Sequence, residues 1–108
     1  MQVPDPVVGR IYRGERLPTG RRVYILGPHG TEQLAPRSRS PLWSFSWGSH
    51  GVGAQELAWA VINDATGDCR LADDWYLDLS VEIVSRLPAD EFQLTARDVV
   101  NWLETSLV

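Results

Sequence analysis

The residues best suited to chemistry surround a glycine-rich segment at residues 48–53. Glycine allows backbone N–H groups to turn toward an anion, and a helix is predicted directly after the segment, where its N-terminus favours negative charge. The candidate contacts to an anion or a nucleic acid are Gly48, Ser49, His50, Gly51, Gly53, Arg37 and Arg39. The alternative is a sharp strand-to-helix turn that needs glycine only for its backbone, which is the commoner use of such a segment.

A hydrolytic enzyme is a poor fit to these residues. Ser49 and His50 are adjacent, so they cannot pair as nucleophile and base, and no Gly-x-Ser-x-Gly sequence surrounds the serine. The only other histidine, His29, falls in a predicted surface turn. We therefore expect no catalytic residue and no enzymatic activity.

Cofactor and metal sites are not expected either. The chain contains no lysine, which a Walker-type phosphate loop requires, and the helix after the glycines is followed by another helix, not by the strand of a dinucleotide-binding unit. Asp73 and Asp74 point in different directions on a helix, and neighbouring acids lack the spacing of a calcium loop. Cys69 is the single cysteine, so no thiolate cluster or internal disulfide is available.

Three aromatic residues alternate in a predicted strand at residues 42–47. Trp43, Phe45 and Trp47 share one face of such a strand. With Arg37 and Arg39 nearby, this face has the composition of a surface that stacks unpaired bases. We favour the other interpretation, a place in the core, because large aromatic side chains dominate small cores and the net charge of −4 opposes a nucleic-acid partner.

A row of carboxylates recurs every four residues in the second predicted helix. Asp74, Asp78 and Glu82 lie on one face of that helix, and like charges at this spacing repel slightly. A negative ridge of this kind suits a basic groove on a protein that handles nucleic acid. The alternative is an ordinary solvated face.

The elements that position these residues change type along the chain. Strands are predicted at residues 7–13, 21–26 and 31–35, in addition to 42–47, with a turn at Pro18 and Gly20. This order predicts an antiparallel meander of three to four strands.

Helices are predicted in the second half of the chain. The first covers residues 54–66 and stops at Gly67, and the second covers residues 72–87. Residues 92–94 form a short extended entry to the third helix, which Thr95 caps with Asp98 three residues later. The fold class is therefore α+β, with the meander packed against three C-terminal helices.

The length of 108 residues indicates a single domain, with a flexible N-terminus at residues 1–6, strands within 7–47 and helices within 54–106. No apolar stretch is long enough to span a membrane and residues 1–6 do not resemble a signal peptide, so we expect a cytoplasmic protein. Charge divides unevenly: residues 1–50 carry seven arginines against three acids, and residues 51–108 carry three against eleven. This charge asymmetry has two interpretations. It marks a surface for a polar partner, or the two oppositely charged halves attract each other within the folded domain.

Several short motifs resemble a family of small bacterial and phage domains of unknown function. They are residues 12–14, 45–48, 55–58, 64–68, 85–88, 94–95 and 102–103. The resemblance spans residues 10–104, although the glycine segment lacks the tyrosine and proline that this family usually has there. It carries no activity, and implies only an association with phages and mobile elements, including interference with host defence.

Together these features favour a non-enzymatic protein-binding module without a cofactor. The partner is a protein that meets Asp74, Asp78 and Glu82, and the mobile-element association suggests an anti-CRISPR-like inhibitor of a host defence complex that targets nucleic acid. The alternative is a regulator that binds nucleic acid or a nucleotide through the arginine-rich strands and the glycine segment. The sequence does not indicate the oligomeric state.

Overall fold

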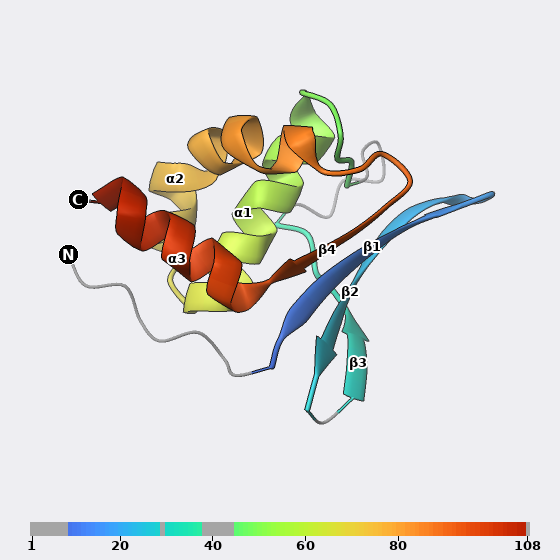
Figure 1. Ribbon diagram of the computed structural model, residues 1–108, viewed down its shortest axis with the longest axis horizontal. Helices are drawn as coiled ribbons and strands as arrows, with labels where there is room; N and C mark the ends of the chain where they lie inside the picture. Colours follow the sequence, from blue (N-terminus) through green and yellow to red (C-terminus); the bar gives the residue numbers. More distant parts are fainter. Residues whose placement is uncertain (1–8, 29, 38–44, 108) are drawn as a thin grey trace.

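A computed structural model describes residues 9–28, 30–37 and 45–107 of the chain. A four-stranded antiparallel sheet lies on one side of three helices, which confirms the predicted α+β class (Figure 1). The strands are β1 (Ile11–Leu17), β2 (Gly20–Gly27), β3 (Gly30–Gln33) and β4 (Glu91–Thr95). The helices are α1 (Val52–Thr66), α2 (Cys69–Glu82) and α3 (Ala96–Leu107), with a short 3-10 helix, η1 (Val84–Arg86), after α2.

The sheet has the strand order β3-β2-β1-β4. The first three strands form the predicted meander, and Leu17 pairs with Gly20 across the predicted turn. Strand β1 begins at Ile11, four residues after the predicted start. Strand β4 comes from the far end of the described chain and pairs with β1, where the ring of Phe92 covers Gly14 so closely that a β-carbon there would overlap it.

The strand predicted at residues 42–47 is wrong in its described part. Residues 45–47 form no strand, and β4 is the fourth strand instead. The alternating pattern reflects burial in a loop: Phe45 and Trp47 are both buried, and the Trp47 ring meets the Phe92 ring edge-on at 4.8 Å between centroids. Both residues therefore belong to the core, as favoured from the sequence, while Trp43 lies outside the described residues.

The predicted end of α1 and the predicted start of α3 are correct, whereas both predicted ends of α2 are wrong. Helix α1 stops at Gly67, which adopts the left-handed conformation. The predicted second helix is too late at both ends, because Asp68 caps α2 at residue 69 and the helix gives way to η1 after Glu82. Helix α3 begins as predicted: Asp98 N–H donates to Thr95 Oγ1, and Thr95 N–H donates to Asp98.

Helix α1 lies between the sheet and the other two helices (Figure 1). Its core residues include Leu57, Val61 and Ile62, and the inner face of the sheet contributes Tyr12, Val23, Ile25, Phe92 and Leu94. On the outer helices, Trp75 and Trp102 are half-buried and meet edge-on at 6.1 Å between centroids. These contacts hold α2 against α1 and α3 and so fix the direction of its exposed face.

Candidate functional site

The exposed face of α2 combines apolar and acidic side chains. Leu77 is 50% exposed and Val81 is 52% exposed, although both are large apolar residues. Asp74, Asp78 and Glu82, the carboxylate row predicted from the sequence, are exposed beside them. Residues three and four apart on a helix are surface neighbours, so the apolar pair and the row form adjacent stripes. We call these five residues the α2 face.

The α2 face carries unbalanced negative charge. None of its three carboxylates forms an ion pair with another described residue. Arg70 and Arg86, the arginines nearest in sequence, are exposed and form no ion pair with the row either. The repulsion within the row is therefore not offset by ion pairing inside the described chain.

The opposite face of α2 is well anchored. Leu71, Ala72 and Leu79 are buried against the core, and Asp68 accepts hydrogen bonds from the N–H groups of Arg70 and Leu71 at 2.9 and 3.4 Å. A helix held in this way keeps the backbone of its exposed face in place, which reduces the backbone entropy lost on binding.

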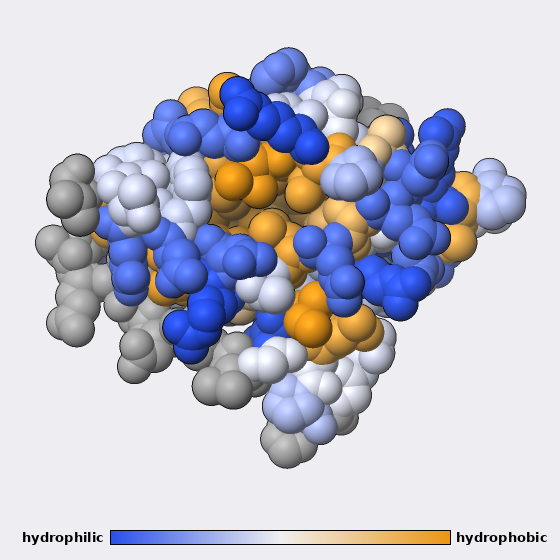
Figure 2. Space-filling view, in the orientation of Figure 1, coloured by the Kyte–Doolittle hydropathy of each residue, from blue (hydrophilic) through white to orange (hydrophobic). Residues whose placement is uncertain are grey.

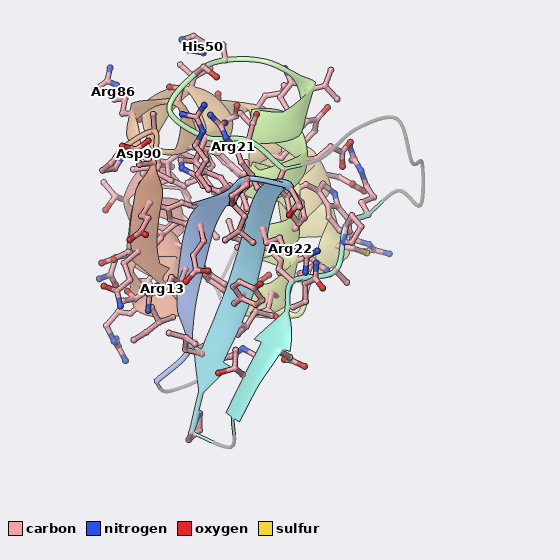
Figure 3. The ribbon with its side chains drawn as sticks, turned by 90° about the vertical axis from the view of Figure 1, so that its right-hand side faces the viewer. Arg13, Arg21, Arg22, His50, Arg86 and Asp90 are labelled. Atoms are coloured by element: carbon pink, nitrogen blue, oxygen red, sulfur yellow. The ribbon has the colours of Figure 1, made fainter. Side chains whose placement is uncertain are left out.

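The glycine segment forms the turn into α1. Gly48 has a φ of 76°, and a β-carbon there would lie 3.0 Å from the carbonyl oxygen of Leu87. The structure thus supplies a packing reason for Gly48. Ser49 and His50 are exposed, Gly51 is the residue before α1, and Gly53 lies in its first turn. In Figure 3, Arg21 and His50 lie at the same end of the molecule, and Arg21 donates to the carbonyl oxygen of Trp47 at 3.3 Å.

Arg37, predicted as a contact to an anion, faces carboxylates and aromatic rings in this structure. Its guanidinium donates to Glu56 at 2.8 Å and lies 5.2 Å from the ring centroids of both Trp59 and Tyr76. The hydrogen bond to Glu56 raises the pKa of Arg37 above its usual value, although burial alone would lower it. Arg39 lies outside the described residues.

Arg13 and Arg22 lie on the face of the sheet that no described helix covers (Figure 3), whereas Arg21 lies on the helix side, 5.2 Å from the centroid of the Trp47 ring. Arg13 pairs across the strands with Tyr24, and Arg22 pairs with Glu15. Acids accompany these arginines: Arg13 Nε lies 3.5 Å from Glu15, which in turn faces Glu91 on β4. The charge of this face is therefore mixed, which is unfavourable for phosphate binding.

A second polar cluster joins the sheet to α1. Asp64 accepts hydrogen bonds from Tyr12 Oη at 2.7 Å and from Arg10 Nε and Nη2 at 3.0 and 2.8 Å. Arg10 also contacts Glu32 at 2.9 Å. Burial, and then the hydrogen bond to Asp64, raise the pKa of Tyr12 well above its usual value. Beside this cluster is a cavity of about 290 Å³, lined by Arg10, Ile25, Gly27, Pro28, Gly30, Thr31 and Glu32.

The acids near the α1–α2 turn already have protein partners. Asp64 holds Arg10 and Tyr12, Asp68 caps α2, and Asp73 accepts a hydrogen bond from Trp59 Nε1 at 2.8 Å. Among the described residues, no group of three or more histidine, cysteine or acidic side chains is arranged to hold a metal ion. Within the same residues, no helix has the length and hydropathy of a membrane span.

The sequence did not identify all of the candidate functional residues that the structure brings together. It placed the carboxylate row on an exposed helix face, but not the neighbouring exposed pair, because Leu77 and Val81 read as ordinary helix residues. The cluster around Arg37 joins residues 37, 56, 59, 73 and 76, and no local spacing links these positions. Figure 2 shows the hydropathy of one side of the molecule, where apolar residues lie between the helices and the sheet and hydrophilic residues surround them.

The match to known families covers most of the chain. Residues 12–105 match a family of unknown function, DUF6166, and the chain belongs to that family. The resemblance drawn from short motifs is therefore confirmed at the level of a domain of unknown function. No curated protein and no solved structure matches the chain.

Proposed function

We propose that this member of DUF6166 is a non-enzymatic protein-binding module, and that the α2 face is its docking surface. The observation that supports the proposal is that one anchored helix carries two exposed apolar side chains beside three carboxylates, which form no ion pair with any residue that the structure describes. The occupant is a protein surface with an apolar groove bordered by arginine or lysine, because such a surface complements both stripes.

The two stripes have different roles in this proposal. Leu77 and Val81 provide apolar area to bury, which lowers the rate of dissociation. Asp74, Asp78 and Glu82 provide long-range attraction to a basic partner, which raises the rate of association and selects against acidic surfaces. The slight cost of repulsion within the row is then offset in the complex.

In its specific form, the proposal makes the partner a nucleic-acid-targeting complex of host defence. A groove that binds phosphates is lined by basic residues, so an acidic ridge is able to occupy it in place of nucleic acid. The chain would then act as an inhibitor of the anti-CRISPR kind, carried by phages or mobile elements. The mixed charge of the open sheet face makes direct nucleic-acid binding the weaker candidate.

The test separates charge from folding. The partner is captured on immobilised wild-type chain and purified, and binding is then measured by surface plasmon resonance at several salt concentrations. The test variant is the triple substitution Asp74→Asn, Asp78→Asn and Glu82→Gln. The control is Asp90→Asn, Glu91→Gln and Glu104→Gln, which removes equal charge from exposed positions elsewhere.

We expect the test variant to fold and to associate with the partner at least roughly tenfold more slowly. Its association rate should also depend less on salt concentration. A third variant, Leu77→Ser with Val81→Ser, should mainly speed dissociation. A folded test variant with unchanged association rate and salt response would refute the proposed surface. Salt-sensitive binding of the wild type to single-stranded or duplex DNA, without a protein partner, would favour the nucleic-acid alternative.

A further inference from the structure

A cage of two aromatic rings and two carboxylates encloses the guanidinium of Arg37. Helix α1 supplies Glu56 and Trp59, and α2 supplies Asp73 and Tyr76, so each helix contributes an acid and an aromatic residue three positions apart. The guanidinium lies 5.2 Å from both ring centroids, 2.8 Å from Glu56 Oε1 and 4.0 Å from Asp73 Oδ1. We call these four residues the α1–α2 cage.

All four residues of the cage come from helices α1 and α2. Helices α1 and α2 pack against each other along their length, and Trp59 Nε1 donates to Asp73 Oδ1 at 2.8 Å, which fixes one ring against one carboxylate. Arg37 instead comes from the irregular segment after β3. The cage therefore belongs to the helical layer, while its occupant comes from outside that layer.

The occupant uses only part of the site. Glu56 is 8% exposed, and its Oε2 is buried without a hydrogen-bond partner among the described residues. A carboxylate usually receives two parallel N–H bonds from an arginine, one on each oxygen, but Arg37 reaches only Oε1. The side chain of Arg37 also stays 35% exposed. A buried carboxylate oxygen without a donor is costly, so a guanidinium that also reached Oε2 would bind more favourably than Arg37 does.

We propose that the α1–α2 cage is a recognition site for an arginine side chain of a protein partner, and that Arg37 occupies it in the free protein. A planar guanidinium is able to stack between two rings and bind a carboxylate with two N–H groups, which an ammonium cannot do. The site therefore selects arginine over lysine. Arg37 competes with the partner and lowers its apparent affinity until displaced.

This inference goes beyond the α2 face and does not rest on it. Asp73 and Tyr76 belong to the same helix as Leu77, so one partner can reach both surfaces, but the cage contains none of the five residues of the α2 face. Substitution of the carboxylate row should leave binding in the cage unchanged. The two proposals can therefore fail separately.

The test removes the internal occupant and supplies a free one. The probe is N-acetylarginine amide, titrated into Arg37→Ala and wild-type protein while the indole Nε1–H resonance of Trp59 is followed by NMR. The matched control protein is Arg22→Ala, which removes an equal charge from the exposed sheet face. The control ligand is N-acetyllysine amide.

We expect Arg37→Ala to bind the arginine probe at least roughly tenfold more tightly than wild type or Arg22→Ala, because the competing side chain is gone. The lysine probe should bind Arg37→Ala several-fold more weakly, and adding Glu56→Gln should remove the difference between the two probes.

Equal binding of the arginine probe to wild type and Arg37→Ala, or no preference for arginine over lysine, would overturn the proposal. If Arg37→Ala does not fold, the titration is made with Arg37→Gln, which keeps much of the aliphatic stem. Failure of both variants to fold would also overturn it, because Arg37 would then be an essential core contact and not a displaceable occupant.

Discussion

A single carboxylate, that of Asp64, connects parts of the chain that lie far apart in sequence. It accepts hydrogen bonds from the hydroxyl of Tyr12 on β1 and from two N–H groups of Arg10, and Arg10 also donates to Glu32 on β3. The side chains of Asp64 and Arg10 are only about one-fifth exposed. Charge-assisted hydrogen bonds in such a place contribute more to stability than an exposed ion pair does.

Tyr12 should make stability depend on alkaline pH. Its pKa in the folded protein is raised, so above pH about 10 the unfolded chain loses this proton while the folded protein keeps it. The free energy of unfolding should therefore fall by up to about 1.4 kcal/mol per pH unit above that point. Below that pH, the Tyr12 hydroxyl is protonated in both the folded and the unfolded chain, so its contribution to the free energy of unfolding is fully present.

The measurement is urea denaturation between pH 8 and 11.5, comparing wild type with Tyr12→Phe, which should lack this part of the slope. Tyr24→Phe, on the other face of the sheet, is the control and should retain it. Equal slopes for wild type and Tyr12→Phe would show that Tyr12 ionises alike in the folded and unfolded chains. At neutral pH, Tyr12→Phe should cost about 1.5–3 kcal/mol, because the lost hydrogen bond is to a charged carboxylate.

Side chains cap the N-termini of α2 and α3. Asp68 accepts two backbone N–H groups at the start of α2, and Thr95 and Asp98 exchange hydrogen bonds at the start of α3. Each cap satisfies donors that the helix itself cannot satisfy. Because α2 also carries the proposed docking surface, the cap at Asp68 affects the order of that surface.

Asp68→Ala should lower the free energy of unfolding by about 1 kcal/mol, and Asp68→Asn should recover most of that loss. The check is the urea midpoint, together with hydrogen exchange at the first turn of α2, which should accelerate in Asp68→Ala. Asp90→Ala, at an exposed acid that caps no helix, should leave both measurements near wild type. A loss of stability in Asp90→Ala equal to that in Asp68→Ala would argue against capping as the cause.

Sequence patterns predicted those elements whose signals are local. Thr95 with Asp98 marked the start of α3, and Gly67 marked the end of α1. The side chain of Asp68 is an equally local signal, but the apolar pattern was taken to start the helix at residue 72, three residues late. The capping residue was therefore visible in the sequence, and the error in the start of α2 came from not assigning that role to it.

Features that depend on distant contacts were beyond local patterns. Phe45 and Trp47 alternate as strand residues do, but a strand also needs a neighbour to pair with, and Trp47 packs on Phe92 instead. The carboxylate row, by contrast, was predictable because it follows from helical spacing alone. The cage around Arg37 requires the packing of α1 against α2, which no spacing within either helix predicts.

Across the whole molecule, the uneven charge of the two halves is used in part within the fold. Arg10 with Asp64, Arg37 with Glu56 and Arg16 with Asp90 each join a basic residue of the first half to an acid of the second. The interpretation that the halves attract each other is thus confirmed for these pairs. The row on α2 takes no part in them.

Stability should be unevenly distributed over the sheet. All four residues of β3 are exposed, and the β2–β3 hairpin extends past the helices (Figure 1). Strand β1 lies between two strands, and Tyr12 and Gly14 on it are buried. Local opening therefore costs less at β3 than at β1.

Native-state hydrogen exchange should show this difference. Amides of β1 and the middle of α1 should exchange only through global unfolding, whereas those paired between β2 and β3 should exchange through local opening and respond weakly to denaturant. Exchange of both sets with the same dependence on urea would contradict the prediction. It would mean that the sheet opens as a single unit.

The place of β4 in the sheet also has a consequence for the order of events during synthesis. Strand β1 meets β2 after a two-residue turn, but its other neighbour follows about eighty residues later, since Ile11 pairs with Thr95. At roughly 5–20 residues per second, a ribosome takes about 4–16 seconds to add that stretch. For that interval the growing chain has a hairpin with one unpaired edge, and Gly14 has no Phe92 above it. Chaperones therefore have a defined window in which to shield this edge from other nascent chains.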